Sequence, residues 1–244
     1  MKNKTFSLII FILIATPFAF TQEPKDTEDW SRRPRMILPG ENHTPPSDAI
    51  VLFDGTNFNE WDGKNGSETW KLVEKTMEVV PGNGTLTTKR MFGDVQLHIE
   101  WRTPREITGD GQDRSNSGIY LMSLYELQVL DSWDNETYYN GQAGSIYKQH
   151  IPLVNACLPP GKWQTYDIIF IAPRFKDDQT LKSPGYFTVF QNGVLIQYNV
   201  ELKDPTVYTG KPEFHYHEQE LPITLQDHGN AVRYRNIWIR ELDL

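Results

Sequence analysis

Cysteine is almost absent from this chain, which has one such residue, Cys157, among 244. A single thiol cannot form a disulfide framework within one chain, and it cannot build a thiolate metal site. Cys157 lies beside the Pro-Pro turn of LPPGKW and far from the N-terminus, so it is not placed to carry a lipid anchor. We expect a buried structural thiol.

Positive charge is also scarce. Lys and Arg number 24 against 32 Asp and Glu, and the formal net charge is -8. Binding to nucleic acid needs clustered Lys and Arg to neutralise phosphates, so we expect no nucleic-acid partner. No basic amphipathic stretch is present, and we therefore expect no stable insertion into a membrane.

Long apolar runs are missing outside the N-terminus. There, Lys2 and Lys4 precede an apolar run from Phe6 to about Phe20. The run is shorter than the roughly 20 residues of a membrane-spanning helix, and Pro17 interrupts its end. This pattern predicts a secretory signal peptide over residues 1–21 and a protein that is periplasmic or secreted.

Several catalytic motifs are missing as well. The sequence has no GxSxG elbow, no HExxH pair and no glycine-rich phosphate loop. It therefore lacks the common signatures of serine hydrolases, zinc proteases and nucleotide-binding enzymes. His-Tyr-His at 215–217 could bind a metal, but no carboxylate at a fixed spacing supports it. No cofactor is predicted from motifs, and a divalent metal ion is left open.

What the sequence does contain is a succession of short strand patterns. Residues 22–47 are rich in proline and charge and predict an extended arm, and residues 48–244 predict a single all-β domain. VQLHIEWR, 95–102, alternates strictly, so we expect one side to be core and the other to face solvent. Gln191 to Val194 predicts a hairpin, because Asn-Gly readily takes positive φ. Together these patterns are typical of a β-sandwich.

Polar side chains are unusually dense in four segments. In YELQVLDSW, 125–133, Glu126 and Gln128 share one side of a strand, while Asp131 has the opposite parity and is expected at the rim. A solvated outer strand face is the simpler alternative for Glu126, and a backbone-capping turn is the alternative for Asp227. The remaining segments supply these candidates for a common site: Arg114, Asn116, Tyr120, Tyr147, Lys148, Gln226 and His228.

In chain order, these strings resemble a bacterial family once known only as a domain of unknown function and now described as 3-keto-disaccharide hydrolases or 3-keto-glycoside lyase/hydratases. The resemblance covers about 49–244 and is carried by FDGTNFNEW, FGDVQLHIEWRTP, SNSGIYL, YELQVLDSW, GSIYKQHIPLVNA and ITLQDHGNAVRYRNIWIREL. One departure is the insertion WDNETYYNGQA, whose aromatic residues Trp133, Tyr138 and Tyr139 could form a wall of the sugar cleft.

The resemblance implies a concanavalin A-like jelly roll with a sugar site on its concave face. It also implies a 3-keto-glycoside substrate, and hence an upstream sugar 3-dehydrogenase that oxidises the sugar first. For such a substrate we expect Glu126 or His228 to be the base that acts at C2, with the other as acid, and Lys148 or Arg114 to stabilise the enolate. A divalent cation could replace that positive charge. The residues expected to hold the substrate are Arg114, Asn116, Tyr120, Gln128, Asp131, Tyr147, Gln226 and Asp227.

Other functions fit the same fold. A non-catalytic carbohydrate-binding module would use the same sandwich, because a fold does not decide a function. A conventional glycosidase would pair Glu126 with Asp131, which their opposite parity disfavours. A scaffold or adhesion role would leave the cluster of polar side chains unexplained.

Overall fold

The computed structural model describes residues 23–63, 69–211 and 213–244. It contains two compact units, one ending at Met36 and the other running from Ile37 to Leu244. The first holds a 3-10 turn, η1 (Pro24–Thr27). The predicted signal peptide lies outside the described residues. Within the described ranges, no helix is long and apolar enough to cross a membrane.

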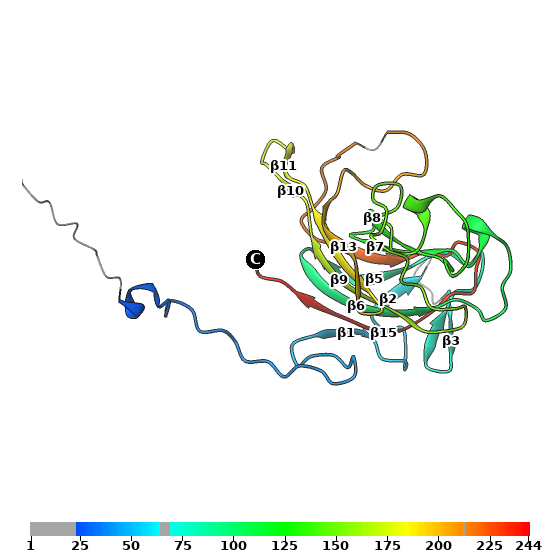
Figure 1. Cartoon of the computed structure of the whole chain (residues 1–244), viewed down its shortest axis with the longest axis horizontal. Coiled ribbons are helices and arrows are strands. Elements are labelled where there is room, and N and C mark those ends of the chain that lie inside the picture. Colours follow the sequence, from blue (N-terminus) through cyan, green and yellow to red (C-terminus); the bar gives the residue numbers. More distant parts are fainter. Residues whose placement is uncertain (1–22, 64–68, 212) are drawn as a thin grey trace, which may run out of the picture. The chain divides into compact units, whose positions relative to one another are not determined.

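The second unit is built around two antiparallel sheets (Figure 1). The larger runs in the order β13-β12-β9-β6-β15-β4-β3, and β1 pairs with β15. Its strands are β1 (Ile50–Phe53), β3 (Lys71–Val73), β4 (Thr76–Glu78), β6 (Val95–Arg102), β9 (Gln164–Ile171), β12 (Tyr186–Gln191), β13 (Val194–Glu201) and β15 (Arg233–Glu241).

The smaller sheet runs in the order β2-β5-β14-β7-β8. Its strands are β2 (Trp61–Gly63), β5 (Leu86–Phe92), β7 (Ser117–Leu121), β8 (Tyr125–Val129) and β14 (Leu221–Leu225). A separate ribbon pairs β10 (Arg174–Phe175) with β11 (Leu181–Ser183), and two further 3-10 turns span η3 (Gly111–Asp113) and η4 (Tyr139–Gly141).

The core consists of the inward side chains of both sheets, as strict alternation along the strands requires. Leu97, Ile99 and Trp101 of β6 are at most 1% exposed, and so are Ile119 of β7 and Leu127 of β8. The predicted all-β sandwich is confirmed.

Two local predictions are also confirmed. The β12–β13 hairpin turns at Asn192 and Gly193, whose φ values are 52° and 78°. Cys157 is a free, buried thiol, and Gln191 Nε2 lies 3.2 Å from its Sγ. Burial raises the pKa of this thiol to about 11, so it behaves as a packing residue rather than as a nucleophile.

The prediction of a wet outer side on β6 is wrong for His98 and Glu100, which are 1% and 7% exposed, whereas Gln96 and Arg102 are partly exposed. His98 stacks between His43, from the predicted arm, and Trp238, at centroid distances of 5.5 and 5.1 Å. Its Nδ1 lies 2.7 Å from Asp167 Oδ1 and its Nε2 lies 3.8 Å from Glu100 Oε1, so His98 pairs with carboxylates instead of with water.

This buried cluster predicts a pH-dependent contribution to stability. Burial alone would lower the pKa of His98, but hydrogen bonds to Asp167 and Glu100 raise it to about 9. Since the folded pKa exceeds that of an unfolded histidine, near 6.5, the stabilisation is complete below pH 6.5 and is lost as pH rises through 9. We expect the His98→Gln substitution to lower the free energy of unfolding by on the order of 2 kcal/mol more at pH 6 than at pH 10.

Urea unfolding of both proteins at the two pH values measures this difference. His215→Gln is the matched control, because His215 is exposed, and it should show no such pH dependence. An equal cost of His98→Gln at both pH values would contradict the ion-paired state of His98.

Candidate functional site

The site begins with the pairing of β7 and β8. Their register sets Tyr120 opposite Glu126 and Gly118 opposite Gln128, and the residues between them, Ile119 and Leu127, point into the core. Gly118 leaves room for the carboxylate, since a Cβ placed there would lie 2.5 Å from Glu126 Oε1. The outward positions of two core strands therefore form one polar floor.

A cavity of about 170 Å³ lies over this floor. It is lined by Asn116, Tyr120, Glu126, Gln128, Tyr147, Thr206, Tyr208, Gln226 and His228. Seven of these nine residues were predicted from the sequence to share a site. The structure brings them together from β7, β8, the segment after η4, and the end of β14.

Glu126 is the buried acid of the cavity, with 3% of its surface exposed. Burial raises the pKa of its carboxyl, a hydrogen bond with Tyr120 lowers it, and the resulting value is about 7. Burial and the nearby negative charge of Glu126 in turn raise the pKa of Tyr120. Near neutral pH, Glu126 can therefore both accept and release a proton, as general acid-base chemistry requires. The alternative of a solvated strand face does not hold for this residue.

Amide side chains supply hydrogen-bonding groups beside the acid. Gln128 Nε2 donates to Asn116 Oδ1 at 3.2 Å, and Gln226 Nε2 donates to the Tyr120 hydroxyl at 3.3 Å. The Oε1 atoms of Gln128 and Gln226 are buried and have no hydrogen-bond partner among the described residues. Buried acceptors are rarely left unpaired, so these two oxygens are suited to accept hydrogen bonds from ligand hydroxyls.

One side wall comes from the chain that runs along the open edge of β8. Gln128 N donates to Ser145 O at 3.0 Å, and Tyr147 N donates to Glu126 O at 3.1 Å. These backbone bonds place Tyr147 beside the acid, and its hydroxyl lies 2.6 Å from that of Tyr138. The insertion thus reaches the site through Tyr138.

Lys148 lies at the rim of the cavity and is exposed. Its Nζ is 4.0 Å from the ring centroid of Tyr138, 5.8 Å from that of Tyr147 and 5.5 Å from that of Tyr208. Such contacts hold an ammonium group over aromatic rings. Trp133 and Tyr139, the other aromatic residues of the insertion, are exposed by 45% and 68% and do not line the cavity.

The lining of the cavity also includes two residues that the sequence did not indicate. Thr206 and Tyr208 lie in an irregular segment between β13 and β14. Thr206 Oγ1 accepts a hydrogen bond from Glu126 N at 3.0 Å, and Thr206 N donates to Leu124 O at 2.8 Å. No strand or motif pattern marks this segment, although its exposed tyrosine is a residue type common in sugar sites.

Three predicted ligand-binding residues lie outside the cavity. Arg114 Nε donates to Asp131 Oδ2 at 2.8 Å in a buried ion pair, and the same guanidinium donates to Trp133 O and Asp134 O. Asp227 accepts hydrogen bonds from Gly84 N and Gly229 N, each at 2.9 Å. All three therefore hold the segments that surround the site, and none of them lines the cavity.

His228 follows β14 and lies at the exposed mouth of the cavity. It lines the same cavity as Glu126. Among the described residues, no three His, Cys, Asp or Glu side chains gather into a metal-binding group.

Comparisons with known proteins agree with this architecture. Residues 48–240 match the family described as the 3-keto-alpha-glucoside-1,2-lyase-like domain. A 3-keto-disaccharide hydrolase of Bacteroides thetaiotaomicron is 24% identical over 236 residues, which cover 81% of each protein.

Solved structures give the same picture. A putative glycosyl hydrolase of Parabacteroides distasonis superposes with a TM-score of 0.87 at 44% identity, over 90% of this chain and 97% of that one. A second protein of the same description and organism superposes at 0.58 with 20% identity, over 80% and 94%. The predicted jelly-roll fold is thereby confirmed. Since the family match spans most of the chain, this protein belongs to the 3-keto-alpha-glucoside-1,2-lyase-like family.

Proposed function

We propose that this protein is an exported carbohydrate-active enzyme that cleaves the glycosidic bond of 3-keto-glycosides by removing the proton at C2 and eliminating the group at C1. The observation that carries the proposal is a buried carboxyl, Glu126, with a pKa of about 7 in a cavity whose other walls are amides, hydroxyls and a histidine. The names of the family and of the Bacteroides relative point to the same class of substrate.

The chemistry needs one base rather than the two carboxylates of an ordinary glycosidase. A ketone at C3 acidifies the hydrogen at C2, so a base can take that proton and leave an enolate. The electrons of the enolate then form the C1–C2 double bond as the C1–O bond breaks, and the departing oxygen receives a proton. Addition of water to the resulting 3-keto-2-hydroxyglucal gives net hydrolysis.

We assign the base to Glu126, because a carboxylate stripped of water has an increased affinity for a proton. His228, at the open mouth of the cavity, is placed to protonate the leaving oxygen. Lys148 supplies positive charge near the enolate from the rim, and Asn116, Gln128 and Gln226 hold the sugar hydroxyls. Arg114 takes no part in this scheme.

A divalent cation could polarise the ketone in place of the lysine. The oxygen ligands available in the cavity would be the carboxylate of Glu126 and the unpaired amide oxygens of Gln128 and Gln226, with His228 as the nitrogen ligand.

Isotope incorporation tests the elimination. We expect the protein to cleave a 3-keto-glucoside but not its unoxidised parent, because only the ketone acidifies C2. In deuterated water, the released keto-sugar should carry deuterium at C2, detected by NMR and mass spectrometry. Cleavage of both compounds at equal rates, or a hydrated keto-sugar product without deuterium at C2, would rule out the mechanism. A binding module would cleave neither compound.

A further inference from the structure

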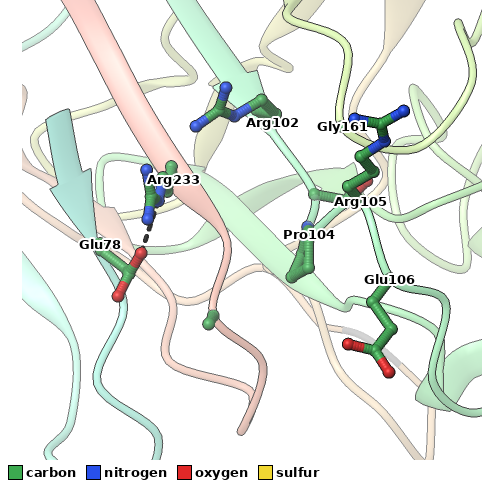
Figure 2. A pocket seen from close by; sticks show the side chains of 9 residues that line it. Glu78, Arg102, Pro104, Arg105, Glu106, Gly161 and Arg233 are labelled. Atoms are coloured by element: carbon green, nitrogen blue, oxygen red, sulfur yellow. Dashed lines mark hydrogen bonds and ion pairs between the residues drawn. The ribbon is translucent and has the colours of Figure 1, made fainter. Parts of the chain in front are cut away.

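A second cavity, of about 470 Å³, lies where β6 ends and β15 begins. Figure 2 shows the guanidinium groups of Arg102, Arg105 and Arg233 around it, with Arg233 turned toward Glu78. Arg102 and Arg233 are on the outer side of the larger sheet, because their neighbours Trp101 and Tyr234 point into the core. This cavity is therefore distinct from the one over β7 and β8.

The arginines of this cavity differ in their ion pairing. The sheet register sets Arg233 between Glu78 on β4 and Arg102 on β6. Arg233 pairs with Glu78 and with Glu74, the latter at 3.0 Å. Arg102 and Arg105 form no ion pair with a carboxylate within residues 23–63, 69–211 and 213–244. Two guanidinium groups thus line the cavity without a direct ion pair to a described carboxylate, and Glu74 and Glu78, which pair with Arg233, act on Arg102 from farther away.

Arg102 is held in place by an aromatic ring. Its guanidinium carbon lies 4.7 Å from the ring centroid of Trp163, and that of Arg235 lies 4.1 Å from the same centroid. Stacking occupies the face of a guanidinium and leaves the N–H groups at its edge free to bind an oxyanion through two parallel hydrogen bonds. Burial, together with the positive charges of Arg233 and Arg235, lowers the pKa of Arg102, and the negative charges of Glu74 and Glu78 offset part of this effect.

Arg105 is positioned by a close contact with Gly161. The aliphatic part of its side chain packs on this glycine, where an added Cβ would lie 2.9 Å from Arg105 Cβ, and Gly161 has a φ of 78°. A larger residue at Gly161 would displace this part of the side chain. The chain therefore fixes both unpaired arginines at the wall of a concave site, although the protein as a whole carries a net charge of -8.

The segment after β14 contributes to both cavities. His228 lines the first and Ala231 lines the second, and three residues of backbone span at most about 11 Å. Glu106, also at the second cavity, offers a carboxylate that accepts hydrogen bonds from sugar hydroxyls.

We propose that the cavity lined by Arg102, Arg105 and Arg233 binds a sugar residue that carries an oxyanion, either the carboxylate of a uronic acid or a sulfate ester. The oxyanion pairs with Arg102 and Arg105, which form no direct ion pair with a carboxylate of the described residues. A volume of about 470 Å³ lies in the range typical of small-molecule sites. The choice of a sugar as ligand rests on the proposed carbohydrate substrate, whereas the choice of an anion rests on the arginines alone.

Calorimetric titration of the folded protein with four probes tests this site: methyl glucuronide, glucose 6-sulfate, neutral methyl glucoside and inorganic sulfate. None of them has a 3-keto group, so the result does not depend on the cleavage reaction. We expect at least one sugar anion to bind ten or more times more tightly than the neutral glucoside, and to bind more weakly as salt is raised. Comparison of methyl glucuronide with glucose 6-sulfate shows whether a carboxylate or a sulfate ester supplies the oxyanion.

Substitutions locate the binding. Arg102→Gln and Arg105→Gln should each weaken binding of the anionic sugar at least tenfold, and Arg105, which is exposed, provides a test even where Arg102→Gln perturbs folding. The Arg90→Gln control, at an exposed position on β5, should leave binding unchanged. Equal binding of the neutral sugar, or unchanged binding in both cavity variants, would overturn the proposal. Inorganic sulfate that binds as tightly as the sugar anions would overturn the choice of a sugar.

Discussion

Replacement of Glu126 by glutamine is expected to lower kcat/KM for a 3-keto-glucoside on the order of 10³-fold, in the range attributed to a single general base. Glutamine fits the space above Gly118 but cannot take a proton from C2. In the wild-type protein, kcat/KM should rise with pH through about 7 as the carboxyl ionises. The residual activity of Glu126→Gln should lack this rise. Initial rates between pH 5 and 9 measure both effects.

The same substitution should increase stability at high pH. The folded pKa of Glu126, about 7, lies above the value of roughly 4.3 for an unfolded glutamate. The folded state therefore binds the proton more tightly, and its stability falls as pH rises from 4.3 through 7. An uncharged glutamine avoids this loss, so Glu126→Gln should be more stable than the wild type at pH 9 by on the order of 3 kcal/mol.

The control is Glu220→Gln, at an exposed position, which should change neither rate nor stability. Activity of Glu126→Gln equal to that of the wild type would remove the assignment of the base. Loss of folding in Glu126→Gln at pH 9 would contradict the expected gain in stability, because removal of a buried charge should stabilise the folded state at that pH.

The parts of the site that could be predicted depend on local patterns. Glu126 and Gln128 share parity within five residues of sequence, and parity fixes the side of a strand once the apolar positions are known. Gln226 and His228, which follow β14, share the parity of Thr224. Their meeting with Glu126 depends on β14, β7 and β8 being neighbours; the resemblance implied a site on one concave face, but this strand order was not predicted.

The parts that could not be predicted depend on contacts between distant segments. The outer side of β6 looked solvent-exposed because nothing local shows that residues near His43 cover His98 and Trp238. Thr206 and Tyr208 belong to a segment without a periodic pattern. Arg114 and Asp131 have the residue types of a sugar site, and only the folded chain shows that they pair with each other.

That pair leads to the largest expected effect on stability. Asp131→Asn leaves the guanidinium of Arg114 in a site where both side chains are less than 10% exposed, without a compensating charge. Removal of one partner from a buried ion pair costs about 3–5 kcal/mol. Asp131 Oδ1 also accepts a hydrogen bond from Trp133 N at 3.2 Å, so the substitution loosens the turn that follows β8 as well.

Chemical denaturation measures this cost. The matched control is Asp62→Asn, because Asp62 and Lys89 form an ion pair 3.8 Å apart with side chains 53% and 48% exposed, and such pairs contribute about 0–1 kcal/mol. Replacing both buried partners, with Arg114→Met and Asp131→Leu, should recover part of the stability because no charge is then left unpaired. Recovery should be incomplete, since Arg114 also donates to Trp133 O and Asp134 O. The contrary outcome is that Asp131→Asn lowers the free energy of unfolding no more than Asp62→Asn does. That result would show that the buried pair does not hold the segment before β7 against the segment after β8, and the positions of Asn116 and Gln128 in the cavity would need another explanation.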